Sequence, residues 1–330
     1  MKLRRAVTAM AALGAAIVAM GQMPMPKSLP DPFGPPQRQW ARLPDGKPWG
    51  QSAGIEIGPH GEIWVIDRCG ANSCDGSDLP AVHQLDPKTG RPIRSIGAGL
   101  FAFPHGLHVD KDGDIWVTDA AISKDKTKGE QVIKLSPEGK VLMRLGTAGV
   151  SGGGPTHFHD PGDVVTAPGG DIFVADGHGT VALTLPPDTI TRIIKFSPGG
   201  KFIKAWGSLG SGKSQFRNPH ALAFDSQGRL FVADRVNGRI QIFDQDGKWL
   251  TEYHTFNHPS GLYIDKNDTL YASDYNSDGQ KGIYIGDART GKLNYFVPDE
   301  QAGEGVALGP DGTLYAATPT GITRFLAKKP

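Results

Sequence analysis

The chain has 330 residues, and its 35 lysines and arginines against 34 aspartates and glutamates give a formal net charge of +1. Because this balance supplies no overall field to attract nucleic acid or an anionic membrane, we exclude both classes of partner. The 45 glycines and 26 prolines are spread along the whole chain, which is typical of many short strands joined by turns.

Residues 1–21 are typical of a signal peptide, because a basic start is followed by an almost wholly apolar run and then by small residues. The run is short for a membrane span, and an uncleaved anchor is the alternative interpretation. We therefore expect an exported protein, periplasmic or secreted, with no stable membrane span after signal removal. Residues 22–37 are rich in proline and are expected to form an extended lead-in.

Cys69 and Cys74 are the two cysteines of the chain and lie five positions apart. In an exported protein this spacing favours a disulfide, with two free thiols as the alternative. Two cysteines cannot supply a tetrahedral thiolate site, so a structural zinc finger is excluded.

An internal repeat is the strongest pattern in the sequence. In each copy, an apolar strand and a glycine turn precede a second strand that contains an aromatic residue and, in five copies, ends in aspartate. The second strands are EIWVID (62–67), DIWVTD (114–119), DIFVAD (171–176), RLFVAD (229–234), TLYASD (269–274) and TLYAAT (313–318). Six copies of such a unit predict an all-β, six-bladed β-propeller over residues 38–330.

The last repeat predicts how the ring closes. It stops after GITRFLA (321–327) without an outer strand, whereas RQWARLP (38–44) resembles an outer strand without a blade. We expect residues 38–44 to complete blade six, because an open sheet edge would otherwise remain.

One position of the inner strands predicts a metal site. Blades two, four and six carry His105, His220 and Glu304 there, and the blades between them carry small residues, namely Ala53, Gly162 and Ser260. Alternate blades of a six-fold ring aim three ligands at one point on the axis. Two imidazoles and a carboxylate suit zinc, with iron(II) or another divalent metal as the alternative. Either histidine could instead be an ordinary polar surface residue.

Several segments resemble a known family of NHL-repeat propellers, the peptidyl-α-hydroxyglycine α-amidating lyases. They are PHGLHVDKDGDIWVTD (104–119), HFHDPGDV (157–164), FVADG (173–177), KFSPGGKFIKAWG (195–207) and QFRNPHALAF…LFVADRVNGRIQIF (215–243). The resemblance covers residues 54–243 and continues more weakly to the end. It implies cleavage of a carbinolamide to a peptide amide and glyoxylate at a channel zinc held by three histidines.

The resemblance also implies roles for particular residues. His105 and His220 match two of the zinc ligands, and the third falls at Glu304. The two functional arginines of the family match Arg68 and Arg235, and its catalytic tyrosine falls at His178. Its calcium site uses backbone carbonyls that match Ile55 and Leu107, but the calcium-binding aspartate falls at Gly305, so calcium is doubtful.

The same chemistry can be argued from residue types. His178 can accept a proton from a metal-bound hydroxyl, with Tyr275 as a second candidate base. The planar guanidinium groups of Arg68 and Arg235 can each bind a carboxylate through two parallel hydrogen bonds. Alternatively, each arginine could pair with a blade-end aspartate, Asp67 or Asp234.

The sequence therefore favours a metal-dependent lyase that acts on a small carboxylate-bearing α-hydroxy amide, either a small molecule or derived from a peptide. A metal-dependent hydrolase of an ester or lactone in the same channel is one alternative. A non-catalytic scaffold that binds a protein or glycan is the other, since a fold alone does not determine function. The oligomeric state is left open.

Overall fold

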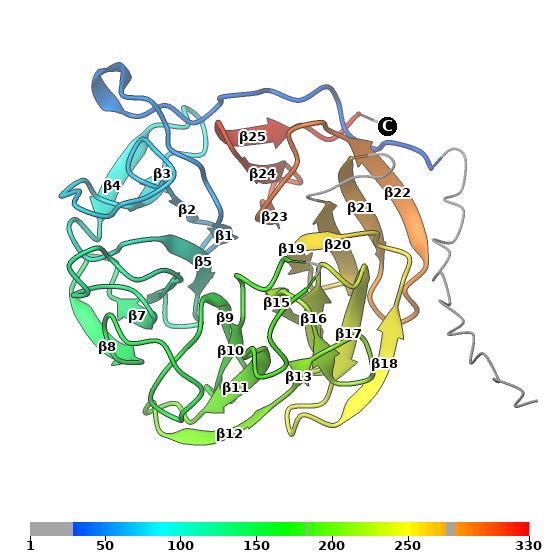
Figure 1. Ribbon diagram of the computed structural model, residues 1–330. Helices are drawn as coiled ribbons and strands as arrows, with labels where there is room; N and C mark the ends of the chain where they lie inside the picture. The colour runs from blue at the N-terminus through cyan, green and yellow to red at the C-terminus, as the bar shows by residue number, and fades with distance from the viewer. Residues whose placement is uncertain (1–28, 183, 275–280, 330) are drawn as a thin grey trace, which may run out of the picture.

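The computed structural model describes residues 29–182, 184–274 and 281–329. Six β-sheets are arranged around a central axis, as Figure 1 shows, so the predicted six-bladed β-propeller is confirmed. Residues 1–21, the predicted signal peptide, lie outside the described residues. No helix within the described ranges is long and apolar enough to cross a membrane.

Each of the first three blades is a four-stranded antiparallel sheet whose strands follow one another from the axis outward. Their strands are β1 (Ile55–Ile57), β2 (Ile63–Ile66), β3 (Val82–Leu85), β4 (Pro92–Ile96), β5 (Pro104–Val109), β6 (Ile115–Asp119), β7 (Gln131–Leu135), β8 (Val141–Leu145), β9 (Pro161–Thr166), β10 (Ile172–Asp176), β11 (Arg192–Phe196) and β12 (Phe202–Trp206).

Blades four and five repeat this order, and blade six has three strands. Their strands are β15 (Pro219–Phe224), β16 (Leu230–Asp234), β17 (Arg239–Phe243), β18 (Trp249–Tyr253), β19 (Pro259–Ile264), β20 (Thr269–Asp274), β21 (Gly282–Asp287), β22 (Leu293–Pro298), β23 (Val306–Leu308), β24 (Leu314–Thr318) and β25 (Gly321–Phe325). A short parallel pair, β13 (Ser208–Leu209) with β14 (Gln215–Phe216), and a 3-10 turn, η1 (Pro44–Gly46), lie between these elements.

The hydrophobic core is divided among the gaps between neighbouring blades. Between blades one and two, for example, Trp64 and Ile66 pack with Val117 and Ile133. Every residue of β2, β6, β10, β16 and β24 is buried, because the second strand of a blade packs on both faces. Outer strands such as β8 alternate between more and less exposed positions, as expected for a strand with one face towards solvent.

The aspartate that ends a second strand binds the segment that enters the inner strand. Asp119 accepts hydrogen bonds from the backbone N–H groups of Ala102, at 3.0 Å, and Phe103, at 2.6 Å. In four blades the donor lies three residues before the channel-facing position, as in the pairs Asp67–Gly50, Asp119–Ala102, Asp176–His159 and Asp234–Arg217. The repeated aspartate therefore fixes the segment that leads into the inner strand in these four blades.

The ring is closed by the N-terminal segment, as predicted, but by different residues. Phe33 pairs with Ala327 and Gln37 with Arg324 in isolated antiparallel bridges, and the Trp40 N–H donates to the Ile322 carbonyl at 3.1 Å. The closing segment is thus 33–40 rather than 38–44, and it begins within the expected lead-in. Pro35 and Pro36 lack the N–H groups that a continuous ladder would need.

Replacing Asp119 with alanine is expected to lower the free energy of unfolding by about 3 kcal/mol, because two buried N–H groups lose their acceptor. Urea denaturation measures the change. Asp112→Ala is the control: its side chain is 63% exposed, so its loss should change the free energy of unfolding by less than about 0.5 kcal/mol. Equal losses in the two variants would contradict the anchoring role of Asp119.

Candidate metal centre

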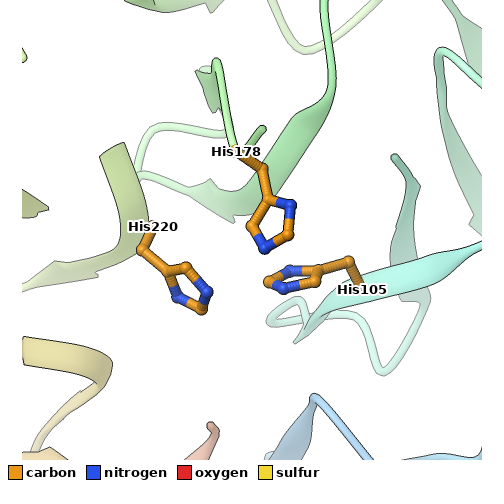
Figure 2. A group of neighbouring side chains, drawn as sticks. All are labelled: His105, His178 and His220. Carbon is orange, nitrogen blue, oxygen red and sulfur yellow. The ribbon is translucent and has the colours of Figure 1, made fainter. Parts of the chain in front are cut away.

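His105 and His220 lie at equivalent positions, one residue into the inner strands β5 and β15. The pairing register of each inner strand with its second strand shifts just after the histidine, between Pro104 and Leu107 and between Pro219 and Leu222. A bulge of this kind bends the strand and redirects a side chain. Both histidine rings accordingly point towards the axis, where their centroids lie 4.8 Å apart (Figure 2).

A backbone carbonyl fixes the tautomer of each ring. Nδ1 of His105 lies 2.7 Å from the Gly162 carbonyl oxygen, and Nδ1 of His220 lies 2.9 Å from that of Ser260. Because a carbonyl can only accept, each Nδ1 carries the proton and each Nε2 presents a lone pair. The small residues of the intervening blades therefore supply the acceptors that orient the histidines.

The two Nε2 atoms have no hydrogen-bond partner, although both are buried. A buried polar atom without a partner is unfavourable and calls for an explanation. A neutral imidazole with its Nδ1 proton held by a carbonyl is the usual form of a histidine that binds a metal through Nε2. These atoms thus have the chemistry and orientation of metal ligands.

His178 is the third imidazole at this point. It follows β10 in blade three, and its ring centroid lies 4.0 Å from that of His105 and 5.1 Å from that of His220. The three side chains offer ligand atoms that all lie within 4.8 Å of one another, as Figure 2 illustrates. The sequence suggested His178 as a base, whereas the structure brings it into the group that could hold an ion.

Glu304 lies beside His220 but outside that group of three. Its Oε2 is 3.3 Å from Nε2 of His220 and accepts a hydrogen bond from the Ser260 hydroxyl at 3.3 Å. Nε2 and an ionised carboxylate are both acceptors, so their approach is unfavourable unless a proton or a cation lies near them. Glu304, the third ligand expected from the sequence, therefore lies close to the histidines. His178, which the sequence suggested as a base, is the third member of the group that could hold an ion.

Burial sets the protonation of the site. Burial, together with the nearby Arg235 and Arg68, lowers the pKa of His178 to about 3. The pKa values of His105 and His220 lie well below the usual value for the same main reason. All three imidazoles are therefore neutral at pH 7, as metal ligands must be. Burial conversely raises the pKa of Glu304.

Arg68 is buried at the edge of the group formed by His105, His178 and His220, the histidine cluster. Its Nε donates to the Pro104 carbonyl at 3.1 Å, its Nη1 donates to Oδ1 of Asn72 at 2.7 Å, and its guanidinium stacks 3.8 Å from the Phe103 ring centroid. Asn72 and Phe103 were not among the predicted site residues, because neither carries a repeated signal. Together they hold the guanidinium plane in one orientation.

Arg235 borders the same cluster from blade four, and its Nη1 donates to the Ser260 hydroxyl at 3.3 Å. The neighbouring Asp234 instead pairs with Arg239 at 2.8 Å. In blade one, Asp67 accepts from the backbone of Gly50. In the contacts described, both blade-end aspartates therefore interact with groups other than the two arginines.

The loop that carries Arg68 is closed by the predicted disulfide, which joins Cys69 to Cys74 with the two Cα atoms 5.2 Å apart. Cys74 is buried in the core between blades one and two. The bridge therefore connects the arginine loop to the packed part of the protein. Tyr275, the second candidate base, lies outside the described residues.

Comparisons with known proteins identify the repeat and several similar enzymes. Residues 101–124 and 216–243 match the model for the NHL repeat. The chain is 26% identical over 295 residues to a probable peptidyl-alpha-hydroxyglycine alpha-amidating lyase of Caenorhabditis elegans, and the match covers 81% of this chain and 79% of the nematode protein. The chain is thus a six-bladed propeller that contains NHL repeats and resembles the amidating lyases.

A second relative is peptidyl-glycine alpha-amidating monooxygenase B of Xenopus laevis, which is 36% identical over 252 residues and matches 70% of this chain. The NHL propeller described here spans 27% of that longer enzyme. A gluconolactonase structure from Xanthomonas campestris superposes with a TM-score of 0.63 at 16% identity and covers 93% of this chain and 99% of its own. At that identity, the likeness shows the shared propeller fold.

Replacing both Cys69 and Cys74 with serine is expected to lower the free energy of unfolding by about 2 kcal/mol, the stabilisation that chain entropy gives a loop this short. Urea denaturation measures the loss. The wild-type protein, unfolded with and without a thiol reductant, is the control and should show the same difference. A wild-type protein whose stability does not respond to the reductant would contradict this account of the bridge.

Proposed function

We propose that this chain is a metal-dependent lyase that cleaves a carboxylate-bearing α-hydroxy amide at the arginine-lined end of the propeller channel. The observation that carries the proposal is the pair of buried, unpartnered Nε2 atoms of His105 and His220, which lie beside His178 and two arginines. The resemblance to the amidating lyases supports the choice of reaction.

His105, His178 and His220 would hold the metal, with zinc as the first candidate and iron(II) or another divalent ion as the alternative. When bound, the metal would supply Lewis acidity and lower the pKa of the hydroxyl group of the substrate. The carbonyls of Gly162 and Ser260 keep the lone pairs of His105 and His220 directed at the axis.

Arg68 and Arg235 would bind the substrate carboxylate. Both side chains are buried next to the imidazoles, where water competes less for the guanidinium groups and a bidentate pair with a carboxylate is strong. The Phe103 ring and Asn72 hold Arg68 before the substrate arrives, which reduces the entropy lost on binding.

Glu304 would act as the base, and His178 would be a metal ligand. These roles are the reverse of those that the sequence suggested. A buried carboxylate with a raised pKa is a stronger base than one in water and is therefore better suited to accept a proton. It would take the proton of the substrate hydroxyl as the carbon–nitrogen bond breaks, and the departing amide nitrogen would gain a proton. The products would be an amide and glyoxylate.

We also propose that the protein acts outside the cytoplasm, either periplasmic or secreted. The Cys69–Cys74 disulfide supports this location, because disulfides persist in oxidising compartments.

Release of glyoxylate from an N-acyl-α-hydroxyglycine tests the reaction directly. We expect turnover that is lost on chelation and restored by zinc, and a His105→Ala, His220→Ala double variant that loses both the metal and at least about 10³-fold in kcat/KM. His254→Ala, at a side chain 39% exposed, is the control and should retain activity. Full activity in the double variant, or turnover only of esters and lactones, would refute the proposal.

Two single variants test the exchanged roles. His178→Ala is expected to weaken zinc binding measured by competition with a chelator, because a ligand is lost. Glu304→Gln is expected to keep the metal and lower kcat by about 10²- to 10⁴-fold, the range typical of a general base. If zinc binding instead depends on Glu304 and not on His178, the assignment made from the sequence is correct and ours is wrong.

A further inference from the structure

We propose that the divalent ion reaches the histidines through the second mouth of the channel, at the end opposite the arginines. The inference rests on the metal centre of the proposed function. It concerns residues that the proposed reaction does not use, chiefly Glu56 and His108.

A cavity of about 230 Å³ runs along the inner strands of all six blades from His105 and His220 towards this mouth. Its lining includes His105, His220 and Glu304 at one end, and Glu56 and His108 further along the same strands. Side-chain exposure rises from 5% at Glu304 to 24% at Glu56. At roughly 30 Å³ per water molecule, the cavity has room for a partly hydrated ion.

The pairing register places the arginines at the other end of the channel. Glu56 pairs with Trp64 at the start of β2, whereas Arg68 follows the end of β2, where its N–H donates to the Gln51 carbonyl. The two ends of the channel therefore carry different charged groups, the arginines at one end and Glu56 at the other.

The charges along the cavity favour a cation. Carboxyl groups occur at Glu56, Asp163 and Glu304, and none of the described residues that line the cavity is a lysine or an arginine. Burial raises the pKa of Asp163 to about 8, so the half-buried Glu56 is the main charge at the mouth. At the opposite end, Arg68 and Arg235 would repel a divalent cation.

The side chains at the mouth form a polar entrance. Nδ1 of His108 lies 3.7 Å from Oε1 of Glu56, and its Nε2 lies 2.8 Å from the Thr166 hydroxyl. At the inner end of the cavity stand the unpartnered Nε2 atoms of His105 and His220. An ion that enters at Glu56 therefore passes the polar side chains of the mouth before it meets the unpartnered Nε2 atoms, while an anionic substrate is favoured only at the arginine end.

The rate of metal uptake tests this route. Apoprotein is mixed with Co²⁺ in a stopped-flow instrument, and the visible absorption of the bound ion is followed at low salt. Glu56→Lys is expected to slow uptake about tenfold, the lower end of electrostatic effects on association, while the equilibrium affinity stays within about twofold of wild type. Glu56→Gln, which makes a smaller change to the structure, should give an intermediate rate.

A control variant separates this route from its alternative. Glu138→Lys makes the same charge change at a side chain 74% exposed in the turn between β7 and β8, and it should take up Co²⁺ at the wild-type rate. Unchanged uptake in both Glu56 variants, or uptake slowed as much in Glu138→Lys as in Glu56→Lys, would overturn the inference and leave the metal centre standing. Failure of the wild-type protein to bind Co²⁺ would instead overturn the metal centre itself.

Discussion

The site depends on one repeated interaction, the hydrogen bond from a backbone N–H to the carboxylate that ends a second strand. In blades one to four the donor precedes the channel-facing residue by three positions, as in Asp119 with Ala102 and Asp234 with Arg217. The second strand is held by the core on both of its faces, so the carboxylate is a fixed reference point. The interaction transfers that rigidity to the start of the inner strand, where His105 and His220 stand.

The alternation of histidines with small residues has a physical reason. Gly162 and Ser260 leave the axis open, and their carbonyls accept the Nδ1 protons of the histidines in the preceding blades. Burying three neutral imidazoles, a carboxyl and two guanidinium groups together opposes folding. The cores between the blades supply the stability that allows this arrangement, and a bound cation would relieve the repulsion between the facing acceptors.

The sequence was sufficient for the fold and for part of the site. Six copies of one unit predicted the six-bladed ring. Because His105 and His220 occupy the same inner-strand position in two copies, the sequence also predicted that their side chains meet. The sequence placed His178 near the metal as a base, but not in the group of three histidines that could hold the ion. Its position follows β10 and lies outside the inner-strand position that His105 and His220 share. The closing segment was misplaced by several residues, since prolines interrupt the alternation that marks a strand.

Blade six joins residues from the two ends of the chain, as shown by Arg324, whose Nε donates to Oε1 of Gln37 across 287 positions at 2.7 Å. Hairpins within blades one to five need only short loops to form, whereas this contact must close a loop of nearly the entire polypeptide, and such contacts form slowly. Folding should therefore finish with the pairing of the N-terminal segment and blade six. Glu304 and β23 belong to the same blade, so the lining of the channel becomes complete only when this pairing has formed.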